Sequence, residues 1–197
     1  MVRVGFVVEG ACERLFIESE SFRAFANGIG IAVCDPVVDV EGGGNLCERN
    51  LSPYILDCQE KAQPDHIIVL TDLDCEPCIT ETKNRIGTKH DVQVVVARQA
   101  LESWFLADDR LTKAWFGVDI PFPEEILGKP WDYLKQLAKL HNVRGPGSTK
   151  LGFVRKKVLS EFGFSIERAA NHANCPSATY FVDRLKRLTI SGSSKPV

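Results

Sequence analysis

Four acidic residues follow two of the apolar segments in this sequence. Glu9 comes directly after VRVGFVV, and Glu13 lies four residues later in a helical pattern. Asp72 closes the apolar segment HIIVLTD, and Asp74 follows it. Residues two apart share a side of an extended chain, so Asp72 and Asp74 can face one crevice, while Glu13 can lie over Glu9. Taken singly, each could be a helix cap or a solvated loop acid, but together they predict a shared site.

Glu102 is a fifth candidate, because it begins a helical pattern after the apolar segment VQVVVAR. In an open α/β sheet, ligands bind outside the carboxyl ends of the strands, which is where these acids are expected. Two carboxylates in close contact repel each other by about 4 kcal/mol near a protein surface, so a cation is expected among them. Oxygen ligands without clustered histidines favour Mg²⁺ or Mn²⁺ over Zn²⁺. Five acids leave room for two ions, an arrangement that serves phosphodiester chemistry.

Strand-like and helical segments alternate in the first half of the chain. This alternation predicts an α/β fold with a mostly parallel, Rossmann-like sheet of about four strands flanked by helices, followed by a C-terminal helical extension. We expect residues 1–110 to form the α/β core and residues 111–197 to form the extension, which completes the site and carries basic residues. The strand-like segments are 2–8, 31–40, 66–72 and 92–98, and the helical ones are 12–26, 50–62, 78–86, 99–109, 111–117, 131–142, 149–163, 165–173 and 177–188.

The composition is that of an ordinary soluble globular protein. Of the 197 residues, 44% are hydrophobic and 25% are charged. No window has the ~18 consecutive apolar residues of a membrane span, and the N-terminus does not have the pattern of a signal peptide. Seven scattered cysteines favour reduced thiols, and the Cys75-x-x-Cys78 pair is interpreted as loop cysteines, because no second pair follows at a zinc-site spacing. We therefore expect a cytoplasmic protein without a membrane segment, whose oligomeric state the sequence leaves open.

Charge is distributed unevenly along the chain. Residues 1–100 contain 9 Lys and Arg against 16 Asp and Glu, whereas residues 143–197 contain 10 against 3. Such an asymmetry suggests a metal-binding end and a phosphate-binding end, and a nucleic-acid backbone needs neutralising charges of this kind. A solvated basic helix face is the alternative. Lys150 is the strongest candidate, since the turn GPGST and a predicted helix N-terminus, which can itself hold a phosphate, precede it. The candidate nucleic-acid-binding residues are Arg144, Lys150, Arg155, Lys156 and Lys157.

Two short motifs carry a resemblance to a known family. Glu-Gly with a second acid four residues after the first (VEGACE), followed by Asp-x-Asp after an apolar strand (VLTDLD), is similar to the Toprim domain. Topoisomerases, bacterial primases, recombination-mediator proteins and the OLD (overcoming lysogenization defect) nucleases share that domain. ALESWFLAD and the lysine of GPGSTKLGF resemble the third acidic motif and the lysine of the OLD-type branch. The sequence also resembles small Toprim-like proteins that end in a CPS motif followed by a helix.

The resemblance implies a metal-dependent nuclease that hydrolyses phosphodiester bonds in DNA or RNA. Glu9 would act as a general base or a metal ligand, and Lys150 would neutralise charge on the scissile phosphate. Ala100 departs from the family pattern, which often has serine two residues before the third acid, so a second ion is less well supported. The resemblance also implies a possible role in antiphage defence beside a partner ATPase. The metal ligands would be Glu9, Glu13, Asp72, Asp74 and Glu102.

Two other functions are compatible with the residues. In a haloacid-dehalogenase-like phosphatase, Asp72 would be the nucleophile and Asp74 the acid, although that motif usually lies on the first strand and continues with Thr where this chain has Glu76. In a non-catalytic Toprim-fold binding module, the pocket would hold metal weakly while the basic helical half docks a partner or nucleic acid.

Overall fold

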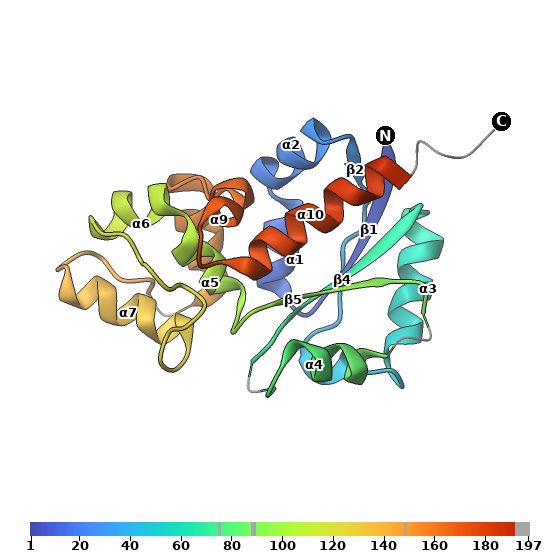
Figure 1. Cartoon of the computed structure of the whole chain (residues 1–197), viewed down its shortest axis with the longest axis horizontal. Helices are drawn as coiled ribbons and strands as arrows, with labels where there is room; N and C mark the ends of the chain where they lie inside the picture. Colours follow the sequence, from blue (N-terminus) through green and yellow to red (C-terminus); the bar gives the residue numbers. More distant parts are fainter. Residues whose placement is uncertain (75, 88–89, 148, 192–197) are drawn as a thin grey trace.

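A parallel β-sheet lies at the centre of the computed structural model, which describes residues 1–74, 76–87, 90–147 and 149–191 (Figure 1). Its strand order is β2-β1-β4-β5, and β2 and β3 pair in turn with the first and second halves of β1. Val8 lies beside Leu70, and Asp72 lies beside Ala97, so β1, β4 and β5 end at the same edge. The strands are β1 (Val2–Val8), β2 (Ile31–Val33), β3 (Val38–Asp39), β4 (His66–Asp72) and β5 (Gln93–Ala97).

Helices cover both faces of this sheet, which confirms the predicted α/β fold. Phe6 and Val8 join a hydrophobic cluster with three helices on one face, and Val7 joins a second cluster with two helices on the other. Burial on both faces explains why the strand sequences are almost continuously apolar. The first face carries α1 (Ala11–Glu18), α2 (Glu20–Gly28) and α10 (Pro176–Ser191), and the second carries α3 (Leu51–Ala62) and α4 (Ile79–Ile86).

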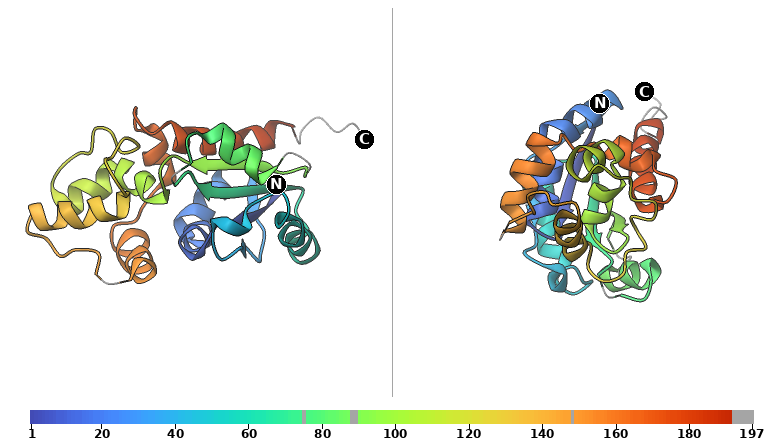
Figure 2. Two further views of the ribbon diagram at one scale, coloured as in Figure 1. Left: turned by 90° about the horizontal axis from the view of Figure 1, so that it is seen from below. Right: turned by 90° about the vertical axis from the view of Figure 1, so that its left-hand side faces the viewer.

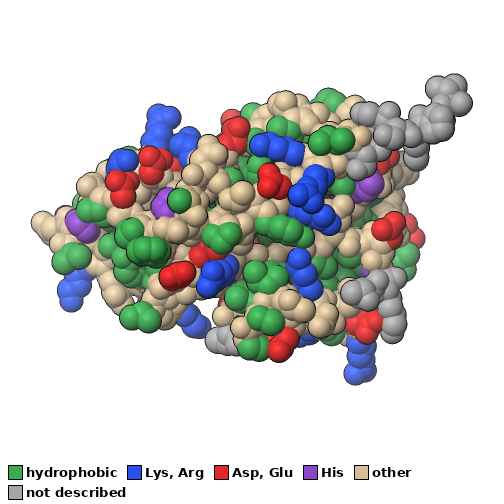
Figure 3. Space-filling model, in the orientation of Figure 1, with side chains coloured by type: hydrophobic (Ala, Val, Ile, Leu, Met, Phe, Trp, Pro, Cys, Tyr) green, Lys and Arg blue, Asp and Glu red, His purple; other side chains and the backbone are tan. Residues whose placement is uncertain are grey.

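The helical half lies beyond the carboxyl ends of the strands, and α10 runs back over the sheet (Figures 1 and 2). Trp104 packs against Phe16 and Phe181, with ring centroids 6.1 and 5.3 Å away. One hydrophobic cluster therefore contains residues from both predicted parts of the chain. Lys and Arg side chains lie over α10 on the face shown in Figure 3. The elements of the helical half are α5 (Leu101–Ala107), α6 (Asp109–Phe116), α7 (Pro130–Leu140), α8 (Lys150–Phe153), the π-helix η2 (Val154–Glu161) and α9 (Ile166–Asn171).

Three predicted segments are interrupted in the structure. The predicted strand 31–40 is divided into β2 and β3, because Pro36 has no N–H to continue the ladder. The predicted helix 12–26 is divided at Ser19, whose Oγ accepts a hydrogen bond from the Phe22 N–H and begins α2 there. The predicted helix 149–163 becomes α8 followed by η2, and the wider turn of a π-helix changes which side chains share a face.

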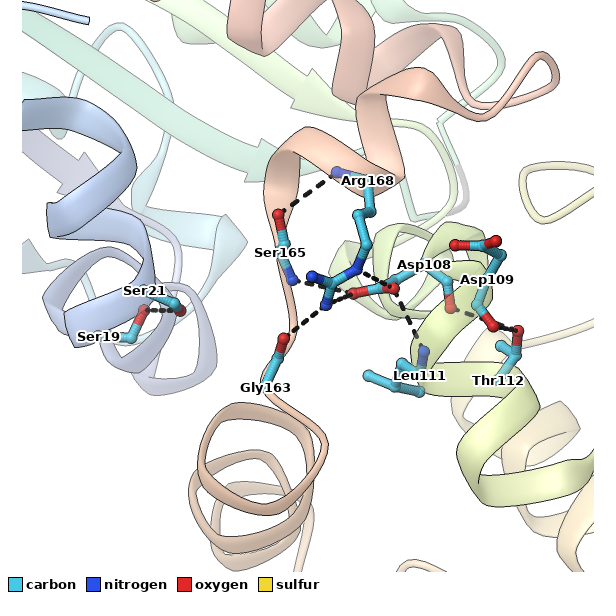
Figure 4. Close-up of polar contacts among 9 residues, drawn as sticks. All are labelled: Ser19, Ser21, Asp108, Asp109, Leu111, Thr112, Gly163, Ser165 and Arg168. Carbon is cyan, nitrogen blue, oxygen red and sulfur yellow. Dashed lines mark hydrogen bonds and ion pairs between the residues drawn. The ribbon is translucent and has the colours of Figure 1, made fainter. Parts of the chain in front are cut away.

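A buried ion pair holds α9 against the start of α6 (Figure 4). The Asp108 side chain is fully buried, and the Arg168 guanidinium donates to both of its oxygens, each at 2.7 Å. Asp108 also accepts hydrogen bonds from the Leu111 and Ser165 N–H groups. The segment that follows Lys150 along the chain is therefore anchored, through α9, to the start of α6.

No helix formed by the described residues has the length and apolar character that crossing a bilayer requires. The described cysteines are free thiols, and Cys75, one half of the CxxC pair, lies outside the described residues.

Candidate active site

Glu9 lies at the point where β1 and β4 end. Its N–H donates to the Leu70 carbonyl oxygen, so the chain continues the β1–β4 ladder by one residue. Its Oε2 accepts a hydrogen bond from Thr71 Oγ at 2.6 Å and another from the Asp72 N–H at 3.0 Å. The structure therefore brings the first and second acidic motifs into contact. Sequence analysis did not single out Thr71, whose buried hydroxyl fixes the Glu9 carboxylate.

Asp72 joins this pair to the start of α5. Its side chain is buried, and Oδ1 accepts a hydrogen bond from the Leu101 N–H at 2.8 Å. A carboxylate is stabilised beside the free N–H groups of a helix start. Ala100 occupies the N-cap position of α5 and has no side-chain oxygen to accept a hydrogen bond from the helix. Asp72, at the end of β4, provides this cap instead. This contact brings Glu102, in the first turn of α5, to the same crevice.

Glu13 and Glu102 are both buried, with 5% and 1% of their surfaces exposed. The pKa of Glu13 is raised to about 7, chiefly by burial and in smaller part by the charges of Glu9 and Glu102, while Lys150 and a backbone hydrogen bond lower it. Burial also raises the pKa of Asp72 well above its usual range, with Glu13, Glu102 and Glu9 adding to the effect. These four carboxylates thus interact with one another, as the sequence predicts.

Lys150 supplies positive charge to this crevice. Its Nζ lies 2.6 Å from Oε1 of Glu102. Burial lowers the pKa of the Lys150 ammonium, but Glu102 and Asp72 raise it by more, so the pKa is raised overall and the group stays protonated. The neighbouring thiol of Cys12 has its pKa raised to about 12 by burial and by nearby carboxylates, so it is neutral and not a nucleophile.

Asp74 lies at the exposed rim of the crevice. Its backbone is left-handed, with φ at 49°, and its N–H donates to the Gln99 carbonyl oxygen. Together with Glu9 and Asp72 it lines an open pocket of about 500 Å³. The structure therefore places Asp74 beside the other acids but in contact with solvent.

The turn EGGGN, which contains η1 (Gly43–Asn45), forms the opposite wall of this pocket. A Cβ on Gly43 would lie 2.9 Å from Oε1 of Glu9, so a side chain at this position would displace the carboxylate. Arg85 holds the turn by donating to the carbonyl oxygens of Gly43 and Leu46. Sequence analysis missed both residues, although a run of three glycines is a signal that the backbone makes a close approach.

The predicted basic residues occupy different places. Arg144, Arg155 and Lys156 are exposed, and Lys157 forms an ion pair with Glu161. Lys150 is the member of this group that forms an ion pair, within the described residues, with an acid of the crevice. In a continuous α-helix Lys150 and Lys157 would lie on one face, but the π-helix η2 begins at Val154 and changes this angular spacing.

An all-oxygen set of side chains suits a hard divalent cation. However, no three His, Cys, Asp or Glu side chains in the described part of the chain are arranged to hold an ion as they stand. Oε2 of Glu9 and Oδ1 of Asp72 already accept hydrogen bonds from backbone N–H groups. Oε1 of Glu9 and Oδ2 of Asp72 take no part in these two hydrogen bonds. The residues fit a cation chemically, but binding would require side-chain shifts.

The raised pKa of Glu13 predicts a pH dependence of stability. Between its ordinary pKa of 4.5 and about 7, the folded state keeps a proton that the unfolded state releases. The free energy of unfolding should therefore fall by up to about 3 kcal/mol as the pH rises through this window. In Glu13→Gln this loss should be absent, so the variant should match the wild type near pH 5 and exceed it above pH 7.

Urea unfolding at both pH values, with a chelator present, measures the difference. Glu18→Gln, an exposed substitution on the same helix, is the matched control and should follow the wild type. Equal pH dependence in the two variants would contradict the assignment.

The fold and this crevice define an α/β protein with carboxylates and one lysine gathered at the carboxyl edge of a parallel sheet. Comparison with protein-family models, curated proteins and solved structures gives no match to the chain. The case for a function therefore depends on the site itself and on the motifs in the sequence.

Proposed function

We propose that this chain is a divalent-metal-dependent nuclease of the Toprim type that hydrolyses phosphodiester bonds in DNA or RNA. The observation that carries the proposal is the meeting of four carboxylates from α1, α5 and the ends of β1 and β4. Lys150 arrives in the same crevice from the helical half. Anionic substrates and several carboxylates are compatible in one site only when cations lie between them.

Each residue has a role that its surroundings support. Glu9 is held by Thr71 and the Asp72 N–H, which leaves Oε1 to accept a proton or contact a metal. Asp74 would be the metal ligand nearest solvent, with Asp72, Glu13 and Glu102 deeper. Lys150 would stabilise the negative charge that develops on the phosphate. A bound Mg²⁺ or Mn²⁺ would polarise a phosphate oxygen and lower the pKa of a bound water.

The rival phosphatase is less well supported by the surroundings of Asp72. A nucleophilic aspartate must approach the phosphorus atom itself, whereas the Asp72 side chain is 8% exposed and its Oδ1 accepts a hydrogen bond from the Leu101 N–H. A non-catalytic binding module would hold nucleic acid in the same way but would not cut it. The experiment below therefore distinguishes it from the nuclease.

The decisive experiment is digestion of supercoiled plasmid and of single-stranded RNA by the full chain with Mn²⁺. Cleavage that a chelator abolishes is the expected result. Thermal unfolding with Mn²⁺ gives a second readout, since an ion that binds only the folded state raises the melting temperature. Turnover of p-nitrophenyl phosphate without cleavage would favour the phosphatase, and nucleic-acid binding without cleavage would favour the binding module.

The composition and the cysteine pattern support a cytoplasmic setting, and the resemblance implies a role in antiphage defence beside a partner ATPase. Co-purification of the tagged chain with an ATPase from its native cells, followed by phage challenge with and without the chain, tests this part separately.

A further inference from the structure

A second pocket adjoins the acidic crevice. Its volume is about 560 Å³, and the start of α4, the end of β5 and the start of α10 line it. Leu73 lines both this pocket and the acidic one. The β4–β5 ladder continues here, because the Leu73 N–H donates to the Ala97 carbonyl oxygen and the Asp74 N–H donates to that of Gln99. Arg98, which lies between these two acceptors in the sequence, is therefore beside the rim of the proposed metal site.

Three cationic side chains and one aromatic ring lie on this side of the crevice. Lys83 belongs to α4, Arg98 directly follows β5, and Arg184 belongs to α10. Lys83 Nζ lies 4.6 Å and Arg184 Cζ 5.7 Å from the ring centroid of Tyr180, so this ring helps to hold both cations. Arg98 and Tyr180 are exposed, and Lys83 and Arg184 are half-buried. We call the pocket together with these four residues the basic groove.

The charges of the basic groove are not neutralised by ion pairs. Lys83, Arg98 and Arg184 form no ion pair with an Asp or Glu side chain among the described residues. Lys150, on the inner side of the crevice, is by contrast paired with Glu102. The cations of the basic groove are thus free to contact a bound anion.

The described lining of the pocket contains one carboxylate, and it is buried. Glu124 is 2% exposed, and its Oε1 accepts hydrogen bonds from the Ser177 N–H, the Ser177 hydroxyl and the Cys175 thiol. The Ser177 hydroxyl in turn accepts hydrogen bonds from the Arg98 N–H at 3.1 Å and the Trp104 indole N–H at 2.7 Å. This network fixes the backbone from which the exposed Arg98 side chain extends.

We propose that the basic groove binds the sugar-phosphate backbone of a nucleic-acid strand, on one side of the phosphate that is cut. The inference rests on the proposed nuclease function. A strand that reaches Asp72 and Asp74 must continue over the adjoining surface, and Leu73 joins these acids to the groove. The carboxylates of the crevice repel the neighbouring phosphates, so cations beside the crevice are needed to hold the strand. This continuity favours nucleic acid over an acidic protein segment, which would meet the same cations.

This route differs from the one over α8 and η2 that the sequence predicts. Arg155 lines a separate pocket together with Glu18 and Glu20, whose charges oppose a phosphate there. Neither Arg155 nor Lys156 is among the described residues that line the acidic pocket or the second pocket. Lys and Arg contacts to phosphates position a strand without reading its sequence, so the basic groove would orient the substrate rather than select a base.

Fluorescence anisotropy of a labelled single-stranded oligonucleotide, titrated with the full chain in a chelator, tests the groove without cutting the strand. Lys83→Gln and Arg98→Gln should each weaken binding about fivefold, the upper end of the range for an exposed ion pair. Each should also reduce the slope of log affinity against log salt by about 0.7, the value for one phosphate contact on a single strand. Neither side chain is buried, so the melting temperatures should stay near that of the wild type.

Lys139→Gln is the matched control, because it removes one exposed charge from α7, and Lys139 lines neither pocket. Its affinity should stay near that of the wild type. Equal weakening by this control, or unchanged affinity in both groove variants, would overturn the proposal. Losses confined to Arg155→Gln and Lys156→Gln would overturn it in favour of η2. Poly-glutamate that competes as well as unlabelled oligonucleotide would overturn it in favour of an acidic protein partner.

Failure here and failure of the nuclease proposal have different signatures. Metal-dependent plasmid cleavage by the wild type, with unchanged oligonucleotide binding in both groove variants, would remove only the basic groove. Weakened binding in the groove variants, without any cleavage by the wild type, would remove only the nuclease.

Discussion

Glu9→Gln is expected to slow metal-dependent cleavage of plasmid DNA by about 10²- to 10⁴-fold, the range for loss of a positioned general base. The amide oxygen of glutamine can still accept the hydrogen bonds from Thr71 and the Asp72 N–H, so the local structure is retained. What disappears is the negative charge that takes a proton or contacts a cation. Initial rates with Mn²⁺, at equal concentrations of folded protein, measure the effect.

Glu60→Gln is the matched control, because Glu60 is an exposed glutamate on α3 and is not one of the residues that line the acidic pocket. Its cleavage rate should equal that of the wild type. If Glu9→Gln cuts as fast as this control, Glu9 does not take part in the chemistry, and the proposed role of the crevice must be abandoned.

Arg168→Ala is expected to lower the free energy of unfolding by about 3 kcal/mol, the low end of the range for breaking a buried ion pair. The substitution leaves the fully buried Asp108 carboxylate without its bidentate partner. The cost is not larger, because Asp108 keeps the Leu111 and Ser165 N–H groups as donors. Since this pair holds the segment that follows Lys150, cleavage should fall as well.

Urea unfolding of Arg168→Ala beside Arg110→Ala measures the loss. Arg110 is an exposed arginine on α6, so its removal should change stability by no more than about 0.5 kcal/mol. Equal stability of the two variants would show that the Asp108–Arg168 pair does not hold the helical half in place.

Much of the sheet could be predicted from the sequence, because strands buried on both faces are almost continuously apolar. The segments 2–8, 66–72 and 92–98 correspond to β1, β4 and β5 within a few residues. Two of the three interrupted predictions fall where one residue changes a regular element, and the third falls where an α-helix passes into the π-helix η2. Pro36 divides a predicted strand, and Ser19 divides a predicted helix, because each changes the backbone hydrogen bonding at one position.

The acids of the candidate site could be listed from the sequence, but the groups that hold them could not. Thr71 and Arg85 act through hydrogen bonds to residues far away in the chain, so their own neighbours in the sequence give no signal. The same is true of Glu124, whose partners Cys175 and Ser177 come from the start of the last helix.

The sequence by itself determined which segments are strands and that acids stand at their carboxyl ends, because both follow from local patterns of apolar and charged residues. Only the tertiary structure decided that Glu9 contacts the Asp72 backbone, that Lys150 pairs with Glu102, and that one buried oxygen of Glu124 has no hydrogen-bond partner among the described residues. The first of these depends on how β1 pairs with β4, and the others depend on how the helical half packs against the edge of the sheet. Such packing depends on many contacts between residues that are far apart in the sequence, so it cannot be predicted from any short segment.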